Sequence, residues 1–572
     1  MVRDHLPRMK HCFMVACLIG SVFAADEEGT VPEKTAKIVE IPSIEAAIPD
    51  PVKALGVPTM FNFPSGIRMA VTATTESAQA HVNQGMNQLH GGWEFEASRH
   101  FAAAMREDPE CLLAHWGMVM TLLTPSPETG LARNAATERL LHLVDQGMGS
   151  ELERGYAYGL IKYIDEGPAA AAAAFRKVAE KFPNDLQARI FAALFGRGGY
   201  NELGDPTPDQ ETAEQSLREL IEKYPLNPIP LNALLTIRAE APDLSKSQEL
   251  ARHLCQMSPE YAPYFHLLGH YEWRCGEHGR AASAFGRASS IYEKWMKENK
   301  TSVADCPEWV KAECYRVVSI VSKGEFDTAY AAALRVAATQ LDPKRLSSPG
   351  DRLLLWDAKT LPARILLHRG LRGNAAEAMQ SLPTPEEIKK THSASLAFWW
   401  IDGLRFALET RRLIDAKKYN DAQEVINAFT LHGEGMARSQ SMAATFGERS
   451  SWTRAYRALE VLASELKGNL VMAGPKDRTG IAYNWFASAT DRQRPTNLMF
   501  PPMILTPMAV HLGEYQLSVG KPSEAIEAYQ RALAAFPNDM NALVGLKNAF
   551  EIAKLPADAA TTAKRIEALR AQ

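Results

Sequence analysis

Residues 85–109 read GMNQLHGGWEFEASRHFAAAMREDP, and the spacing within this stretch decides the fold. Gly85 is followed twelve residues later by Ala97, sixteen later by Phe101 and twenty-four later by Pro109. Nearly the same skeleton returns three more times along the chain. Its members are Gly159, Ala171, Phe175 and Pro183; Gly269, Ala281 and Phe285; and Gly513, Ala525, Tyr529 and Pro537. A repeat of this kind predicts pairs of antiparallel helices stacked side by side.

The residue types have a steric reason. A glycine and an alanine allow two helices to cross closely, the aromatic ring fills the space under the next pair, and the proline ends the second helix. One helix pair cannot bury its apolar face alone, so neighbouring pairs must stack and the array curves into a superhelix. We therefore expect an all-α fold of the α-solenoid class.

The skeleton resembles that of tetratricopeptide repeat (TPR) proteins. Residues 78–85 read AQAHVNQG and residues 97–117 read ASRHFAAAMREDPECLLAHWG, which is similar to the opening repeats of a group of exported bacterial TPR proteins of unassigned activity. This resemblance implies a bacterial origin, export and the TPR fold, and it implies no reaction. The chain departs from the group at His81 and Val82, where aromatic residues are usual, so the packing expected there is not carried over.

The first 24 residues have the pattern of a signal peptide. Arg3, Arg8 and Lys10 give a basic start, residues 12–23 are apolar, and cleavage is expected after Ala24. A lipid-attachment motif ending at Cys17 is the weaker alternative, because almost no apolar stretch precedes it. The apolar run is too short to span a bilayer, and no later run approaches eighteen residues. These features predict an exported protein, periplasmic or secreted, with no stable membrane span after cleavage.

Charge and cysteine content narrow the function further. The formal charge of the chain is -4, and cleavage would remove three basic groups and one acidic group, which leaves a mildly acidic protein. No basic stripe is present, so nucleic acid is not an expected partner. Five cysteines would remain, too few for a disulfide scaffold, although bridges from Cys306 or Cys275 stay open alternatives.

The chain divides by composition into several segments. Residues 25–75 are rich in proline and weak in apolar periodicity, as in an extended arm or linker. Residues 76–342 form a first TPR-like array, residues 343–351 a linker with proline, serine and glycine, and residues 352–572 a second array. Within the second array, residues of about 466–503 are less regular, and we interpret them as an insertion or a lid.

The sharpest cluster of chemically active residues lies between Tyr264 and His278. His266 and His270 are four residues apart, which places both imidazoles on one helix face at a spacing that can hold a transition metal. A third ligand would have to come from Cys275, His278 or Glu272. The TPR resemblance also implies which positions face the concave groove. These are His266, His270, Trp273 and Arg274, with His90 at the corresponding place in the first repeat.

Three interpretations of this cluster are open. The residues could form a ligand groove, with Arg274 binding a carboxylate and Trp273 stacking on the ligand. His266 and His270 could instead bind a metal ion. In the third interpretation, the side chains only pack and form hydrogen bonds between helices.

No standard catalytic motif is present: we find no Gly-x-Ser-x-Gly elbow, phosphate-binding loop, dinucleotide fingerprint or Cys-x-x-Cys pair. We therefore expect a non-enzymatic adaptor or scaffold of the bacterial envelope that binds a protein or peptide and needs no cofactor. The alternative is a metal-binding protein or an enzyme, with a transition metal at His266 and His270.

Overall fold

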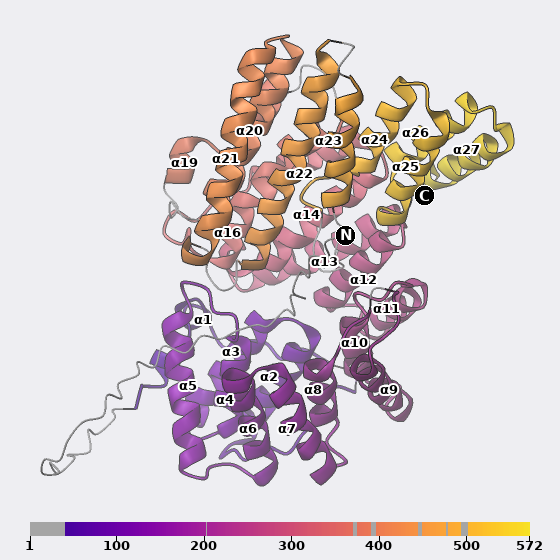
Figure 1. Ribbon diagram of the computed structural model, residues 1–572. Coiled ribbons are helices and arrows are strands. Elements are labelled where there is room, and N and C mark those ends of the chain that lie inside the picture. The colour runs from indigo at the N-terminus through magenta and orange to yellow at the C-terminus, as the bar shows by residue number, and fades with distance from the viewer. Residues whose placement is uncertain are drawn as a thin grey trace, which may run out of the picture. The chain divides into compact units, whose positions relative to one another are not determined.

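The computed structural model describes residues 41–63, 65–201, 203–369, 375–389, 396–443, 449–475, 479–493 and 502–571 (Figure 1). Within these ranges the chain consists of α-helices and short 3-10 helices, and its β-type pairing is one isolated bridge between Tyr200 and Pro206. The predicted all-α fold is therefore confirmed. None of the helices in these ranges combines the length and apolarity that crossing a membrane requires. The predicted signal peptide, residues 1–24, lies outside the described residues.

The first of two compact units comprises the chain up to Leu123 together with Thr129–Arg238. Its helices are η1 (Glu45–Ala47), α1 (Asp50–Lys53), α2 (Glu76–Gly91), α3 (Glu94–Glu107), α4 (Leu112–Thr121), α5 (Gly130–Asp145), α6 (Glu151–Glu166), α7 (Pro168–Lys181), α8 (Leu186–Gly196), α9 (Pro208–Lys223) and α10 (Pro228–Ile237). Thr75, Ser150 and Asp185 begin α2, α6 and α8 by accepting a hydrogen bond from a backbone N–H of the first turn.

The second unit comprises Thr124–Glu128 and the chain from Ala239 onward. Its helices are α11 (Ser245–Met257), α12 (Ala262–Arg274), α13 (His278–Glu298), η2 (Val303–Asp305), α14 (Pro307–Ser322), α15 (Phe326–Ala337), α16 (Pro349–Trp356), η3 (Ala358–Thr360), α17 (Leu361–Arg369), α18 (Ala375–Ser381), α19 (Pro385–Lys389), α20 (Leu396–Asp415), α21 (Tyr419–Ala443), α22 (Arg449–Ala473), α23 (Thr479–Arg492), α24 (Met508–Ser518), α25 (Pro522–Ala535), α26 (Met540–Ile552) and α27 (Pro556–Arg570).

The segment 343–351, which we assigned to a linker, lies inside the second unit. Ser348 caps α16 by accepting a hydrogen bond from the Asp351 N–H, and a carboxylate oxygen of Asp351 accepts one from the Asp342 N–H at 3.0 Å. The two units divide instead between Arg238 and Ala239. Serine followed by proline signals a helix start as well as a linker, and here the helix start accounts for it.

The repeat skeleton has the geometry that its residue types predict. An added Cβ at Gly85 would lie 2.7 Å from the ring of Phe101, and the corresponding distances from Gly159 to Phe175 and from Gly513 to Tyr529 are also 2.7 Å. Gly269 and Phe285 repeat the contact at 2.6 Å. The four alanines have no exposed surface: Ala97, Ala171, Ala281 and Ala525. Pro109, Pro183 and Pro537 each lie two residues beyond the end of the second helix. The fold is a TPR-like α-solenoid.

A second glycine connects two of these rings, Phe101 and Tyr529, to the next helix pair. Gly117 on α4 meets the ring of Phe101, and Gly545 on α26 meets the ring of Tyr529. Each of these two rings is therefore enclosed by three successive helices rather than two. This contact explains physically why one helix pair depends on its neighbour.

Residues 466–503, which we interpreted as an insertion or a lid, include the end of α22 and the whole of α23, which form another pair of repeat helices. Gly468 on α22 would place a Cβ 2.7 Å from the ring of Phe486 on α23, and Ala482 is fully buried four residues before that ring. The interval from the glycine to the aromatic residue is eighteen residues here and sixteen in the other copies. Because the connection between the two helices is longer, the spacing of this copy does not match the skeleton of the other copies.

Within the second unit, two distant helix corners meet. Asn538 Nδ2 donates to the Gly276 carbonyl at 3.1 Å, and a His278 ring nitrogen lies 3.0 Å from the Pro537 carbonyl. Trp273 also faces the Phe536 ring at 6.4 Å between centroids. The corner between α12 and α13 is thus joined to the corner between α25 and α26, so the last repeats of this unit pack against its first.

Candidate functional site

His266 and His270 lie together on α12, as their spacing predicts. Their rings are 4.9 Å apart in an edge-to-face arrangement. Both rings also contact the repeat aromatic Phe285, at 5.4 and 5.2 Å, and Tyr315 of α14, at 5.4 and 4.7 Å. The pair is therefore enclosed by aromatic rings of its own array.

This environment keeps both imidazoles neutral. Burial, with a smaller contribution from the charge of Lys311, lowers the pKa of His270 to about 3. Burial also holds the pKa of His266 well below its ordinary value, with smaller contributions from His270 and Lys311. Nδ1 of His266 has no hydrogen-bond partner. Neutral imidazoles without acidic partners are poor general bases near neutral pH.

The structure gives no support to a metal site at this pair. In the part of the chain that the structure describes, no group of three or more His, Cys, Asp or Glu side chains is placed to hold a metal ion. Glu272, one of the possible third ligands, is instead engaged by Gln248 Nε2 at 2.6 Å and by Arg252 Nε at 2.6 Å. Its carboxylate joins α11 to α12.

Trp273 and Arg274 differ in their surroundings. Trp273 is 7% exposed, and its Nε1 donates to Ser322 Oγ at 3.2 Å, so little of the indole is open to a ligand. Arg274 is half-buried. Burial lowers the pKa of Arg274, while the charge of Glu240 opposes that shift. The hydrogen bond of Trp273 joins α12 to α14.

His90 belongs to the first unit. A ring nitrogen lies 3.2 Å from Gln187 Oε1, the ring lies 4.7 Å from that of Phe191, and the backbone carbonyl accepts a hydrogen bond from Asn232 Nδ2 at 2.7 Å. Burial lowers the pKa of His90 to about 4, although the hydrogen bond to Gln187 partly opposes the shift. His90 thus helps to join α2, α8 and α10.

A feature of the first unit that the sequence analysis missed lies on α2. We call it the amide ladder and define it as Gln79, Asn83 and Asn87. Asn87 binds both backbone groups of Ile67, accepting from its N–H at 2.8 Å and donating to its carbonyl at 2.9 Å. Asn83 does the same to Met69, at 2.9 and 3.1 Å.

The third member of the ladder continues the pattern, because Gln79 Oε1 accepts from the Val71 N–H at 3.2 Å. The ladder residues are four apart on the helix and therefore lie on one face, while the residues that they bind are two apart in an extended chain. Side-chain amides thus replace the neighbouring strand of a sheet. Gly66 precedes the first residue that the ladder binds. A side chain at this position would collide with the ladder, since a Cβ on Gly66 would lie 2.5 Å from Asn87 Oδ1.

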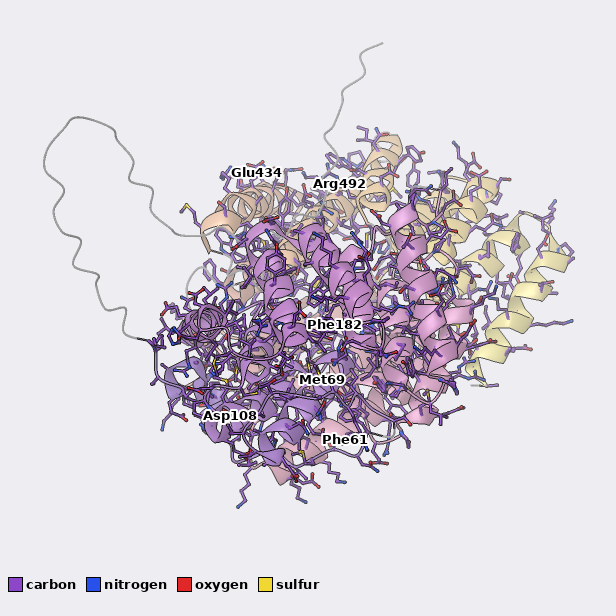
Figure 2. The ribbon with its side chains drawn as sticks, turned by 90° about the horizontal axis from the view of Figure 1, so that it is seen from below. Phe61, Met69, Asp108, Phe182, Glu434 and Arg492 are labelled. Carbon is purple, nitrogen blue, oxygen red and sulfur yellow. The ribbon has the colours of Figure 1, made fainter. Side chains whose placement is uncertain are left out.

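The segment bound by the ladder belongs to residues 25–75, which we expected to form an extended arm or linker. Its described part does not extend freely into solvent. Ala47 and Ile48 have no exposed surface, and Val52 is 3% exposed. Farther along, the Thr72 N–H donates to Glu153 of α6 at 2.7 Å, and Figure 2 shows Phe61 and Met69 among the side chains of the first unit.

The second unit contains a polar pocket that the sequence analysis also missed. It lies between α17, α20, α22 and the start of α24. Its polar lining residues are Arg364, His368, Arg411, Glu465, Thr506 and His511, and its walls are otherwise mostly aliphatic. A pocket with apolar walls and a few converging polar groups is a common form of binding site.

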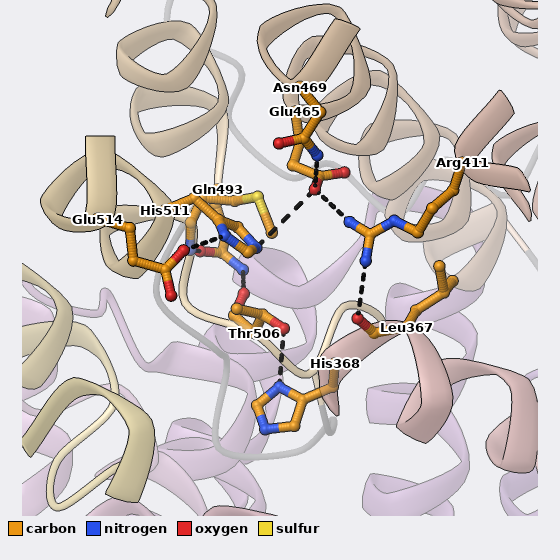
Figure 3. A network of polar contacts seen from close by, with 10 residues as sticks. Leu367, His368, Arg411, Glu465, Asn469, Gln493, Thr506, His511 and Glu514 are labelled. Atoms are coloured by element: carbon orange, nitrogen blue, oxygen red, sulfur yellow. Dashed lines mark hydrogen bonds and ion pairs between the residues drawn. The ribbon is translucent and has the colours of Figure 1, made fainter. Parts of the chain in front are cut away.

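Glu465, which lines this pocket, is joined to three other side chains in a network of polar contacts (Figure 3). Its Oε1 accepts from Arg411 Nη2 at 2.5 Å and from Asn469 Nδ2 at 2.5 Å, and His511 Nε2 lies 3.9 Å away. The carboxylate is 2% exposed. Arg411 and Glu465 therefore neutralise each other, as buried charges must.

His511 lies between two carboxylates. Its Nδ1 is 3.0 Å from Glu514 Oε2 on the same helix, in addition to its approach to Glu465. Burial pushes the pKa of His511 down, but the hydrogen bond to Glu514 and the two negative charges more than offset burial and the opposing charge of Arg411, so the pKa is raised.

His368 lies on the other side of the pocket. Asn541 Nδ2 donates to its Nε2 at 3.3 Å, so its Nδ1 carries the proton and donates to Thr506 Oγ1 at 2.7 Å. Gln493 Nε2 donates to the Thr506 carbonyl at 2.8 Å. Burial lowers the pKa of His368 to about 3, and His511 adds to the shift. This side of the pocket is held in place by neutral hydrogen bonds.

Comparisons with known proteins bear on the fold alone. The chain matches no protein-family model, and no curated protein matches it. One similar solved structure is that of the yeast Tom70, with 11% identity and a TM-score of 0.26; the match covers 86% of this chain and 93% of that chain. Another is the human IFIT1 dimer with m7Gppp-AAAA, with 13% identity and a TM-score of 0.30; the match covers 87% of this chain and 92% of that chain. A third is the TPR domain of P58(IPK), with 13% identity and a TM-score of 0.20; the match covers 83% of this chain and 98% of that chain. The fold assignment rests on the glycine and aromatic contacts described above.

Proposed function

We propose that the protein is a scaffold that binds a protein or peptide partner, exported to the bacterial envelope and either periplasmic or secreted. The observation that carries this proposal is the amide ladder, in which a helix of the array holds an extended stretch of polypeptide by its backbone groups. Backbone recognition of this kind is independent of sequence, and neighbouring side chains then select among segments. A rigid stack of helices presents such side chains at fixed intervals.

Export is supported by the basic start, the apolar run and the small residue at Ala24, and by the resemblance to exported bacterial TPR proteins. The test is N-terminal sequencing of the protein recovered from the envelope fraction. We expect the mature chain to begin at Ala25. A chain that keeps Met1 and remains in the cytoplasm would contradict export.

The proposal includes no enzymatic activity, no cofactor and no nucleic-acid partner. The charges in the polar pocket neutralise one another, and the mature chain would be mildly acidic, which disfavours binding to phosphate backbones. The histidines of α12 are neutral and lack acidic partners, so they offer no general base.

The partner can be sought by site-specific photocrosslinking in the cell. A photoreactive residue replaces Ala80, which is exposed on α2 beside the ladder, and a matched control replaces Leu131, which is 88% exposed on α5. We expect a defined crosslinked protein from position 80 and none from position 131. Equal crosslinking from both positions, or none from position 80, would contradict a binding surface on α2.

A further inference from the structure

The amide ladder recognises groups that every peptide has. Asn87 and Asn83 each bind the N–H and the carbonyl of one residue, and neither contact depends on the side chain of the residue that is bound. The ladder amides are also oriented in advance. Asn87 Nδ2 donates to the Asn83 carbonyl at 2.8 Å, and Asn83 Nδ2 donates to the Gln79 carbonyl at 3.2 Å, so their oxygens face the bound segment.

The bound segment has the alternation of a half-buried strand. Ile67 is 4% exposed and Val71 is 8% exposed, and Met69 between them is half-buried. Arg68, Ala70 and Thr72 are exposed. The site therefore accepts an extended chain with apolar residues at every second position, and the intervening positions can vary.

We propose that this face of α2 is a binding site for an extended segment of a partner protein with apolar residues at alternate positions, and that residues 67–71 of the chain occupy it as a displaceable substitute. This inference rests on the proposed scaffold function and names the ligand of its ladder. The hydrogen bonds require an extended backbone, and the buried positions of Ile67 and Val71 require apolar side chains two or four residues apart.

The chain's own segment competes from close range. Met69 lies only a few residues before α2, so the segment is held near the ladder at an effective concentration of about millimolar or higher. A free peptide should therefore bind the intact chain weakly. A partner with additional contacts, or a chain whose own segment is weakened, would shift occupancy toward the partner.

The experiment uses a fluorescent peptide with the sequence SGIRMAVTATT, which is that of residues 65–75. The full mature chain is compared with an Ile67→Asp/Val71→Asp variant, in which the chain's own segment cannot bury its apolar side chains. We expect the peptide to bind this variant at least about tenfold more tightly than the intact chain, as measured by fluorescence anisotropy. Addition of Asn83→Ala and Asn87→Ala should abolish the gain.

A control peptide carries an N-methyl group on the residue that corresponds to Met69, which removes the N–H donated to Asn83 and leaves the side chains intact. We expect this peptide not to bind. If the Ile67→Asp/Val71→Asp variant retains native helicity and still does not bind the unmodified peptide, the proposal is overturned. Equal binding of the two peptides would also overturn it.

Hydrogen exchange of the unmodified chain gives a second test that needs no variant to fold. If residues 67–71 are displaceable, the amides of Ile67, Met69 and Val71, which donate to the ladder, should exchange at least about tenfold faster than the central amides of α2. Exchange of both at the same rate would show that the segment opens only when α2 unfolds, and would overturn the proposal. Either experiment can fail while crosslinking from position 80 succeeds, so failure of this inference is distinguishable from failure of the proposed function.

Discussion

Phe101 and Gly117 are in direct contact, so close that a methyl group on Gly117 would lie 2.2 Å from the nearest ring atom. A methyl group on Gly85 would also lie 2.7 Å from this ring. One aromatic side chain on α3 therefore sets the separation of α3 from both α2 and α4. Tyr529 occupies the same position between Gly513 and Gly545.

Substituting Gly117 by alanine should destabilise the first unit. The added methyl group must push the ring of Phe101 out of a fully packed position, and overpacking of this kind costs about 1 to 3 kcal/mol. The urea midpoint, followed by circular dichroism, should fall accordingly. Gly130→Ala is the matched control, because nothing lies within 4 Å of the added atom. Equal midpoints for the two variants would contradict the packing argument.

Substituting Glu272 by glutamine should weaken the contact between α11 and α12. The carboxylate accepts hydrogen bonds from Gln248 and from two nitrogens of Arg252, and glutamine removes its charge and adds competing donors. We expect a loss of about 1.5 to 3 kcal/mol in the free energy of unfolding. Glu249→Gln, at an exposed position of α11, should change it by less than about 0.5 kcal/mol. A similar loss in both variants would argue against a specific role for Glu272.

The stabilising effect of His511 should depend on pH. Because its pKa is raised in the folded protein, its contribution is fully present below the unfolded value of about 6.5 and is lost as the pH rises through the folded value. We expect the wild type to exceed His511→Gln in urea midpoint by more at pH 5.5 than at pH 8.5. The change should stay below about 1 kcal/mol, since Glu514 is exposed and screened.

Other groups that titrate between pH 5.5 and 8.5 affect the urea midpoints of the wild type and of His511→Gln alike, so their effect cancels in the difference between the two midpoints. His253→Gln, at an exposed position of α11, serves as the control and should show the wild-type dependence on pH. A His511→Gln variant that keeps the same difference from wild type at both pH values would refute the role of the ion pair.

His270 should resist chemical modification. At pH 7 it is neutral, because burial lowers its pKa to about 3, so a low rate of carbethoxylation can only reflect burial. We expect His253 to react at least about tenfold faster with diethyl pyrocarbonate, measured by peptide mass spectrometry. If a chelator raised the reactivity of His266 and His270 together, a bound metal ion would be indicated and the packing interpretation would be wrong.

The helix pairs could be predicted from the sequence because their signal is local. Gly85, Ala97 and Phe101 lie within two helices and one turn, and the steric reason for each can be stated without knowing the rest of the chain. The same logic failed at Gly468 and Phe486 because two additional residues in the connection changed the spacing, while the contact in space stayed the same.

The candidate sites were only partly predictable. The spacing of His266 and His270 correctly placed both rings on one face, but Tyr315, which covers them, comes from another helix. The polar pocket had no local signal, since Arg411, Glu465 and His511 belong to three helices that only the folded array brings together. The four-residue spacing of Gln79, Asn83 and Asn87 was visible in the sequence, but their partners were not.

By itself, the sequence determined the class of fold, the positions of four helix crossings and the residues that share a helix face, because these follow from sterics and periodicity over short distances. Only the tertiary structure decided which faces are covered and by what. The arm fills the amide ladder on α2, and the last repeats of the second unit close on its first. Such contacts depend on the accumulated path of many helices, which no local spacing encodes.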